Sequence, residues 1–453
     1  MRLRYLLTAT LLLIISTSFG QIEFKKISYT QALHLAKVEK KLILLQIESD
    51  NCLQCNEVAA QGLQSKTIQL LTDEKFICLK TNKIPDELYN GNSPFSFSDS
   101  FFGTLFLNEE GSILNIMKLT TSQSSTYEDA IANTINVNKH QGVSIKYLDS
   151  IYRQNNNFVN LLNLVRIINN FALEVKQPLI DSLVELAPQD SAKSISFLSL
   201  IAECAPDVYS QSYIYIRNDY PVFNEMWYNI PLKTRIQIND RAIAKSLSKA
   251  IKEKNIDYAK KVAFFSKSIN TNTNEGEKNA NKNLLDYFYS VKDTIQYKNA
   301  AIAFYNKYFM SINVDSIKRL DNKKKENLDM IAKRNTTKGA PMELRSYTFL
   351  PEAEYYGKQL NRGAWNLYMF SSNKSELQLA LKWAQNAVAF YQDPDIFDTY
   401  ARLLYKIGKK ETAMKWEAKA VESAGLANRN KTKSEYSDVL KRMALNEENI
   451  NTY

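Results

Sequence analysis

The sequence is short of the two residues that most often interrupt regular structure. Of its 453 residues, 12 are glycine and 10 are proline, and each is well under the roughly 5–7% of an average chain. Neither G-x-G-x-x-G nor G-x-x-x-x-G-K-[ST] occurs, so the usual marks of a nucleotide-binding loop are missing. This scarcity argues against β-sandwiches and propellers and predicts a chain that is mostly helical.

Histidine and cysteine are also scarce. Two histidines, His34 and His140, argue against a multi-histidine metal site and against a hydrolase built on a Ser–His pair. We interpret both as solvated surface residues. Of the four cysteines, Cys78 lies in an apolar run and Cys204 in a helical one, and both are expected to be buried packing residues. No metal or cofactor is expected.

The remaining composition is that of a folded, multi-domain protein. Apolar residues make up 45% of the chain and aromatic residues 11%, which is enough to form cores. The length predicts two or three domains. The net charge of +10 is scattered, with a local run at Lys323–Lys325. Because nucleic-acid binding would need a basic stripe interleaved with aromatic residues, we expect no nucleic-acid partner.

Residues 1–20 have the pattern of a secretory signal peptide. Arg2 and Arg4 precede the apolar run Leu11–Ile15, and small residues follow as far as Gly20. An apolar core of about ten residues is half of the about 20 that a membrane span needs. No later stretch is apolar enough to span a membrane. We therefore expect cleavage near Gly20 and a mature protein that is periplasmic or secreted, in an oxidising space.

Strand-like and helix-like segments alternate over residues 21–138, which predicts an α/β domain in the order α-β-α-β-loop-β-β-α. A helix over Ser28–Ala36 leads to the β-rich run Leu42–Ile47, and a helical stretch then runs from Cys52 to about Leu71. The later strands are predicted at Phe76–Leu79, Thr104–Leu107 and Ile113–Met117, with a hairpin turn at Gly111 and a final helix after it.

Strand signals fade after Gln141, and residues 139–345 are predicted to be α-helical. Apolar residues recur at helical spacing, for example at Phe158, Leu161, Val165 and Ile168. Two polar stretches, Asn270–Asn283 and Lys333–Pro341, are predicted to be exposed loops or linkers.

Residues 346–453 contain an internal repeat. Ala380, Trp383 and Ala387 are matched 33 residues later by Ala413, Trp416 and Ala420, close to the 34-residue period of paired-helix repeats. The segment Asp398–Ala413, with a turn glycine at Gly408, resembles a tetratricopeptide repeat, and the match covers about two repeats. The resemblance implies an all-α, tetratricopeptide-like helical-repeat region.

The pair Cys52-x-x-Cys55 is the sharpest chemical signal. It follows a predicted buried strand and begins a helix. A cysteine at a helix N-terminus meets unpaired N–H groups that favour its thiolate. We expect Cys52 to be the more accessible thiol and Cys55 to be buried behind it. A redox-active pair is the favoured interpretation; a static disulfide and half of a metal site stay open as alternatives.

The order of elements from Glu23 to Val137 resembles that of the thioredoxin-like family, in its exported branch with an extra N-terminal helix. The resemblance implies that Cys52 is the attacking cysteine and Cys55 the resolving one. Asn51, Gln46 and Gly103 stand where the family commonly has a tryptophan, a buried acid and a cis-proline.

These observations lead to two functional hypotheses. The first is an exported thiol–disulfide oxidoreductase that uses Cys52 and Cys55, with the helical repeats docking a periplasmic client protein through its thiols or disulfides. The alternative is a non-catalytic protein-binding scaffold with a degenerate thioredoxin fold, which would tolerate loss of Cys52.

Overall fold

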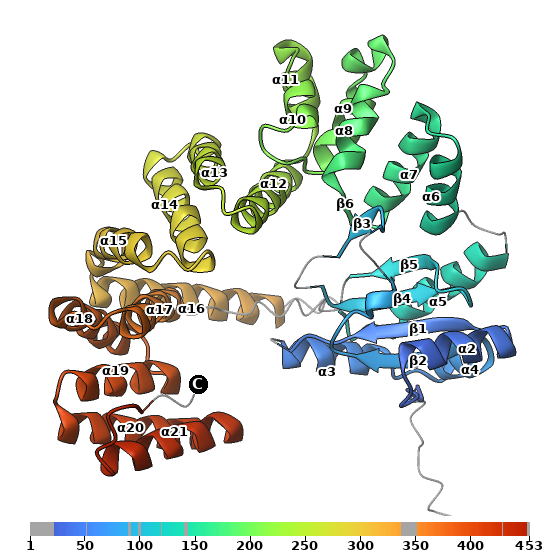
Figure 1. Ribbon diagram of the computed structural model, residues 1–453. Coiled ribbons are helices and arrows are strands. Elements are labelled where there is room, and N and C mark those ends of the chain that lie inside the picture. The colour runs from blue at the N-terminus through green and yellow to red at the C-terminus, as the bar shows by residue number, and fades with distance from the viewer. Residues whose placement is uncertain are drawn as a thin grey trace, which may run out of the picture. The chain divides into compact units, whose positions relative to one another are not determined.

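The computed structural model describes residues 22–50, 52–88, 92–97, 101–118, 120–139, 144–336, 351–427 and 429–450 (Figure 1). The predicted signal peptide, Asn51 and His140 lie outside these residues. The chain divides into two compact units, with the division between Ala242 and Ile243.

A four-stranded mixed sheet lies in the first unit. Its strands are β1 (Leu42–Ile47), β2 (Phe76–Thr81), β4 (Gly103–Leu107) and β5 (Ile113–Met117), in the order β2-β1-β4-β5. Strands β1 and β2 are parallel, β4 is antiparallel to β1, and β5 is antiparallel to β4. All four strands were predicted from the sequence, because each is a short apolar run bounded by polar or glycine residues.

Four helices accompany this sheet: α2 (Tyr29–Glu39), α3 (Leu53–Gly62), α4 (Lys66–Lys75) and α5 (Ser124–Lys139). The prediction of one helix from Cys52 to about Leu71 was wrong in part, since that stretch forms both α3 and α4. The break has a local cause: the Ser65 side chain accepts a hydrogen bond from the Ile68 N–H and caps α4. Together with the sheet, these helices confirm an α/β region at the N-terminal end of the described chain.

Both faces of the sheet are covered. On one face, strand residues pack against α4 and α5 in a single cluster that includes Leu42, Leu44, Phe106, Ile68 and Ile131. The alternate side chains Ile43, Leu45 and Leu105 are also fully buried. The near-continuous burial of β1 explains why its sequence is a run of apolar residues rather than an alternation.

The remaining elements of the first unit are mostly helical. A turn of 3-10 helix, η1 (Asp86–Leu88), and strand β3 (Phe95–Ser96) precede β4. After α5 come the elements α6 (Ile145–Gln154), α7 (Phe158–Asn170), β6 (Glu174–Val175), α8 (Gln177–Glu185), η2 (Gln189–Lys193), α9 (Ile195–Glu203), α10 (Gln211–Tyr215) and α11 (Tyr220–Asn229).

Hydrogen bonds join the α/β region to the helices that follow it. Strand β3 pairs antiparallel with β6, and the Lys176 N–H donates to the Pro94 carbonyl over 3.2 Å. The Arg153 guanidinium donates to the Asn92 carbonyl over 2.7 Å. The change from alternating to helical periodicity near residue 139 and the division at Ala242 therefore fall at different places in the chain.

The second unit is helical throughout its described residues. Helix α12 (Leu232–Lys252) spans the division between the units. The elements that follow are α13 (Ile256–Ser268), α14 (Thr273–Ser290), α15 (Thr294–Tyr305), the π-helical turn η3 (Asn306–Met310), α16 (Val314–Thr336), α17 (Glu352–Phe370), α18 (Lys374–Phe390), α19 (Pro394–Lys406), α20 (Lys410–Leu426) and α21 (Asn430–Ala444).

The polar stretch Asn270–Asn283 was predicted to be a loop, and that prediction was wrong. Asn272 caps α14 by accepting hydrogen bonds from the N–H groups of Asn274 and Glu275, and the helix then packs against α13. A polar first half is tolerated because the buried side chains lie near the other end, at Leu285 and Tyr287. The second predicted linker, Lys333–Pro341, extends outside the described residues.

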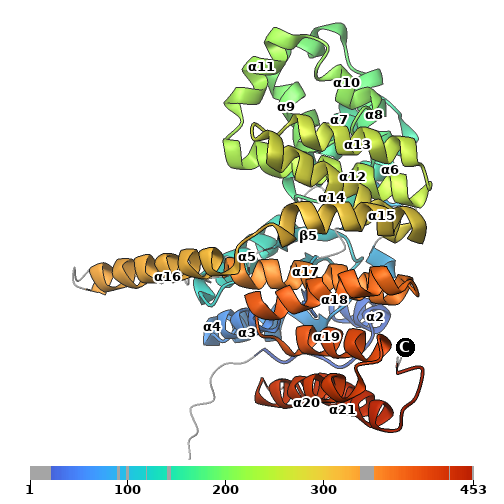
Figure 2. The same ribbon diagram turned by 90° about the vertical axis from the view of Figure 1, so that its left-hand side faces the viewer.

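Helices α17 to α21 pack one after another (Figure 2). Helix α17 pairs with α18, and α19 pairs with α20 after a turn at Gly408, whose φ is +91°. The predicted packing alanines Ala380, Ala387, Ala413 and Ala420 are all fully buried. Small side chains at these positions allow the paired helices to approach closely.

One charged cluster is buried in this second unit. The Arg402 side chain donates to Asp398 over 2.7 Å, and both lie on α19 and are almost fully buried. Glu417 on α20 is fully buried beside Asp398, and no cation donates a hydrogen bond to its carboxyl oxygens among the described residues. Burial and the charge of Asp398 raise the pKa of Glu417 far above its ordinary value, so that this carboxyl group is protonated at pH 7.

Candidate functional site

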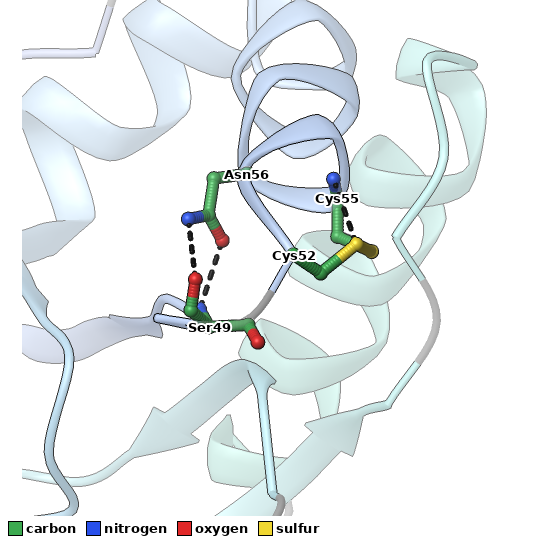
Figure 3. The surroundings of a disulfide bond; sticks show 4 residues. All are labelled: Ser49, Cys52, Cys55 and Asn56. Atoms are coloured by element: carbon green, nitrogen blue, oxygen red, sulfur yellow. Dashed lines mark hydrogen bonds between the residues drawn. A yellow bond between two sulfur atoms is a disulfide. The ribbon is translucent and has the colours of Figure 1, made fainter. Parts of the chain in front are cut away.

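Cys52 and Cys55 form a disulfide at the point where β1 gives way to α3 (Figure 3). Their Cα atoms are 5.2 Å apart. Cys52 occupies the N-cap position of α3, and Cys55 lies in the first turn of that helix. The sequence-predicted pair is therefore brought together, and the reason is local, because one helical turn separates the two residues.

The first turn of α3 directs N–H groups at Cys52. The Cys55 N–H lies 3.3 Å from the Cys52 Sγ, and the Cys55 and Asn56 N–H groups donate to the Cys52 carbonyl. The N–H groups of a first helical turn carry the positive end of the helix dipole. When the disulfide is open, this arrangement favours a thiolate at Cys52.

The surroundings of the disulfide are partly exposed, and Cys55 is more exposed than the sequence predicted. Cys52 and Cys55 are both half-buried, whereas Cys55 was expected to be buried. Leu53 between them is 73% exposed. Burial on α3 begins at Ala59, so the first turn of the helix, which carries Cys55, belongs to its more exposed half.

Asn56 is a residue of the site that the sequence analysis missed. Its amide Nδ2 donates to the Ser49 carbonyl, and its Oδ1 accepts from the Ser49 N–H, each over 2.9 Å (Figure 3). The two bonds link the segment before Cys52 to the helix after it. An asparagine four residues after a capping cysteine is a weak signal, since asparagine on a helix is usually a surface residue.

Gln46, a position singled out in the sequence, lies at the end of β1 that leads to the disulfide. Gln46 and Thr104 face each other across β1 and β4, both are buried, and the Thr104 hydroxyl donates to Gln46 Oε1 over 2.7 Å. They form a neutral polar pair between the last residues of β1 and the first residues of β4. Asn51, another position singled out in the sequence, lies outside the described residues.

Gly103 opens β4 opposite Ile47. Its φ is +140°, and a Cβ at this position would lie 2.3 Å from the Met117 carbonyl oxygen. Glycine is required here for both reasons, because other residues rarely adopt such a backbone and none has room.

The other two cysteines and His34 are separate from the site. Cys78 is buried in β2, where burial and the nearby Asp73 raise its thiol pKa to about 12. Cys204 is buried at the end of α9, and His34 is exposed on α2. The described residues contain no group of three or more His, Cys, Asp and Glu side chains that could hold a metal ion.

A cavity in the first unit lies away from the disulfide. It has a volume of about 520 Å³ and is lined by residues that include Glu87, Phe95, Gly111, Ile145 and Arg153. Neither Cys52 nor Cys55 belongs to its lining. The half-buried disulfide is therefore separate from this cavity.

Comparison with known proteins gives the chain no family. No protein-family model matches it, and no curated protein is significantly similar in sequence. Within the described residues, every helix is too short or too polar to cross a membrane.

Proposed function

We propose that the protein is an exported thiol–disulfide oxidoreductase whose chemistry is carried by Cys52 and Cys55. The observation that carries the proposal is the half-exposed Cys52–Cys55 disulfide at the N-terminus of α3, directly after a buried strand. Such a pair opens and closes without disturbing a core, which is what exchange chemistry requires. The sheet order β2-β1-β4-β5, with two antiparallel strands after a parallel pair, supports a thioredoxin-like fold.

The exchange proceeds in two displacements. In the first, the Cys52 thiolate attacks a client disulfide; a bond forms between Cys52 and one client sulfur, the client S–S bond breaks, and the other client sulfur leaves as a thiolate that takes up a proton. In the second, Cys55 loses its proton and attacks the Cys52 sulfur, which closes the Cys52–Cys55 bond and releases the first client sulfur. Two electrons and two protons pass to the client, and the reverse sequence oxidises a client dithiol.

The helical region supplies the docking role in this proposal. The paired helices α17–α18 and α19–α20, with buried alanines at the predicted spacing, support tetratricopeptide-like repeats. Such stacked pairs form extended surfaces that bind other proteins. The client is a periplasmic or secreted protein that carries thiols or a disulfide.

Trapping of the mixed disulfide tests the role of each cysteine. A Cys55→Ser variant that has been reduced and mixed with a disulfide-bonded peptide is expected to accumulate a covalent adduct at Cys52, because the second displacement is blocked. The matched Cys52→Ser variant is expected to form little adduct. Peptide mapping by mass spectrometry locates the linkage in each protein.

The second candidate function is a non-catalytic scaffold. The neutral Gln46–Thr104 pair favours it, because no buried carboxylate lies there to accept a proton from an attacking thiol. Thiol counts after equilibration of the native protein in glutathione buffers distinguish the two functions. A Cys52–Cys55 bond that stays closed in every buffer while the protein is folded would support the scaffold and contradict the oxidoreductase.

A further inference from the structure

Reduction of the disulfide removes the covalent link between Cys52 and Cys55, whereas the hydrogen bonds of Asn56 do not involve the sulfur atoms. The segment before Cys52 is already tied to the sheet on its other side. The Glu48 N–H donates to the Thr81 carbonyl over 2.7 Å, and Asp50 accepts from the Asn82 amide over 3.1 Å. Asn56 is the residue that ties this same segment to α3.

The two Asn56 bonds have an unusual span. They reach back seven residues to the Ser49 backbone, and Cys52 and Cys55 both lie inside the loop that they close (Figure 3). The amide pairs with a donor and an acceptor of one residue, as a neighbouring strand would, so Ser49 is fixed in both position and orientation. Both groups are partly buried, which limits competition from water.

We propose that Asn56 is a positioning residue that keeps Cys52 at the N-cap of α3 after the disulfide opens. The inference rests on the proposed redox function of the pair. With Ser49 held against the helix, the Cys52 sulfur stays close to the Cys55 N–H, from which it accepts a hydrogen bond in the disulfide form. Without Asn56, Ser49 loses these two hydrogen bonds to the helix, and the Cys52 thiolate is held less firmly against the N–H groups that stabilise it.

The test is the pH profile of alkylation in the reduced, full-length protein. Wild type and Asn56→Ala are treated with limiting iodoacetamide from pH 5 to 10, and the modified sites are mapped by mass spectrometry. In Asn56→Ala, the profile for Cys52 is expected to move to higher pH, and its rate at pH 7 is expected to fall by roughly threefold to tenfold, the range of a helix-terminus interaction.

A matched control separates positioning from a general effect on α3. Gln61→Ala changes an exposed polar residue near the other end of the same helix and is expected to leave the Cys52 profile unchanged. Buried Cys78 should remain unmodified in all three folded proteins. Identical Cys52 profiles in Asn56→Ala and wild type would overturn the proposal, whether that shared profile is acidic or ordinary.

A second measurement needs no variant. The proposal predicts that the Ser49 amide stays protected from hydrogen exchange in reduced wild-type protein, because its bond to Asn56 persists; rapid exchange on reduction would overturn it. The first measurement follows thiol reactivity and the second follows backbone protection, and neither needs a client protein. If the protein fails to exchange with client disulfides, the proposed function fails while the Asn56 result still stands on its own.

Discussion

Replacement of Glu417 by glutamine is expected to stabilise the protein at neutral pH. Glu417 is fully buried beside Asp398 and has no cationic hydrogen-bond partner among the described residues. Its raised pKa means that the folded protein holds a proton there at pH 7, whereas the unfolded chain does not. Glutamine has the same shape and needs no proton, so the substitution removes this requirement.

The magnitude follows from the pH range over which the two states differ. At a pH below the unfolded-state pKa of about 4.3, the folded and unfolded chains both hold the proton, so ionisation of Glu417 does not change the free energy of unfolding. As the pH rises above that value, only the unfolded chain releases its proton, and the free energy of unfolding falls by about 1.4 kcal/mol per pH unit. At pH 7 the accumulated loss is about 3.7 kcal/mol, and Glu417→Gln is expected to recover roughly 2–4 kcal/mol of it.

Urea unfolding of wild type and Glu417→Gln from pH 4 to 8 measures this difference. Trp365, Trp383 and Trp416 all lie in the second unit, so tryptophan fluorescence reports mainly on it. Glu422→Gln, which changes an exposed carboxylate on the same helix, is the matched control and is expected to change stability by less than about 0.5 kcal/mol. A stability difference for Glu417→Gln that does not grow with pH would refute the reasoning.

Three further outcomes are expected. Gly103→Ala should lower the free energy of unfolding by roughly 2–4 kcal/mol, because it combines a strained φ with a steric clash. Gly408→Ala should lower it by only about 1 kcal/mol, since its φ is also positive but a Cβ there meets nothing within 4 Å. Urea unfolding compares the two variants, and equal losses of stability would contradict the clash at Gly103. A fragment that ends at residue 242 should protect the β3 amides from hydrogen exchange, and one that ends at residue 139 should not, because it lacks β6; protection in both would show that β6 is dispensable. Expression in a bacterium that exports proteins should yield an intact mass without about the first 20 residues, and a retained Met1 would contradict the predicted signal peptide.

Local signals in the sequence were sufficient for the elements that surround the site. The run Leu42–Ile47 predicted β1 with its observed bounds. A strand that is buried on both faces is almost continuously apolar, and Gln46 is the one polar residue in this run. The proximity of Cys52 and Cys55 also followed from local sequence, since two cysteines three residues apart at the start of a helix lie one turn from each other. The repeat of alanine and tryptophan at 33 residues predicted the buried faces of α18 and α20.

Two of the errors concern packing between elements, which the sequence does not encode locally. The polar residues of α14 predicted a loop, but the helix packs against α13 and buries Leu285 and Tyr287. Cys55 was expected to be buried because it was expected to lie one turn inward and to face the sheet. Which side of α3 is covered is a tertiary property, and burial on this helix begins only at Ala59.

The sequence by itself identified the closely spaced cysteine pair and the segments that are apolar enough to form strands and helix faces, because these depend on side-chain type and spacing. Only the tertiary structure decided which backbone groups those residues meet. Asn56 bonds to Ser49 because the chain turns back on itself between β1 and α3, and the pKa of Glu417 is raised because packing of α20 against α19 buries its carboxyl group beside Asp398. Hydrogen bonds and burial depend on distance in space, and spacing along the chain predicts that distance only within a turn or two of helix.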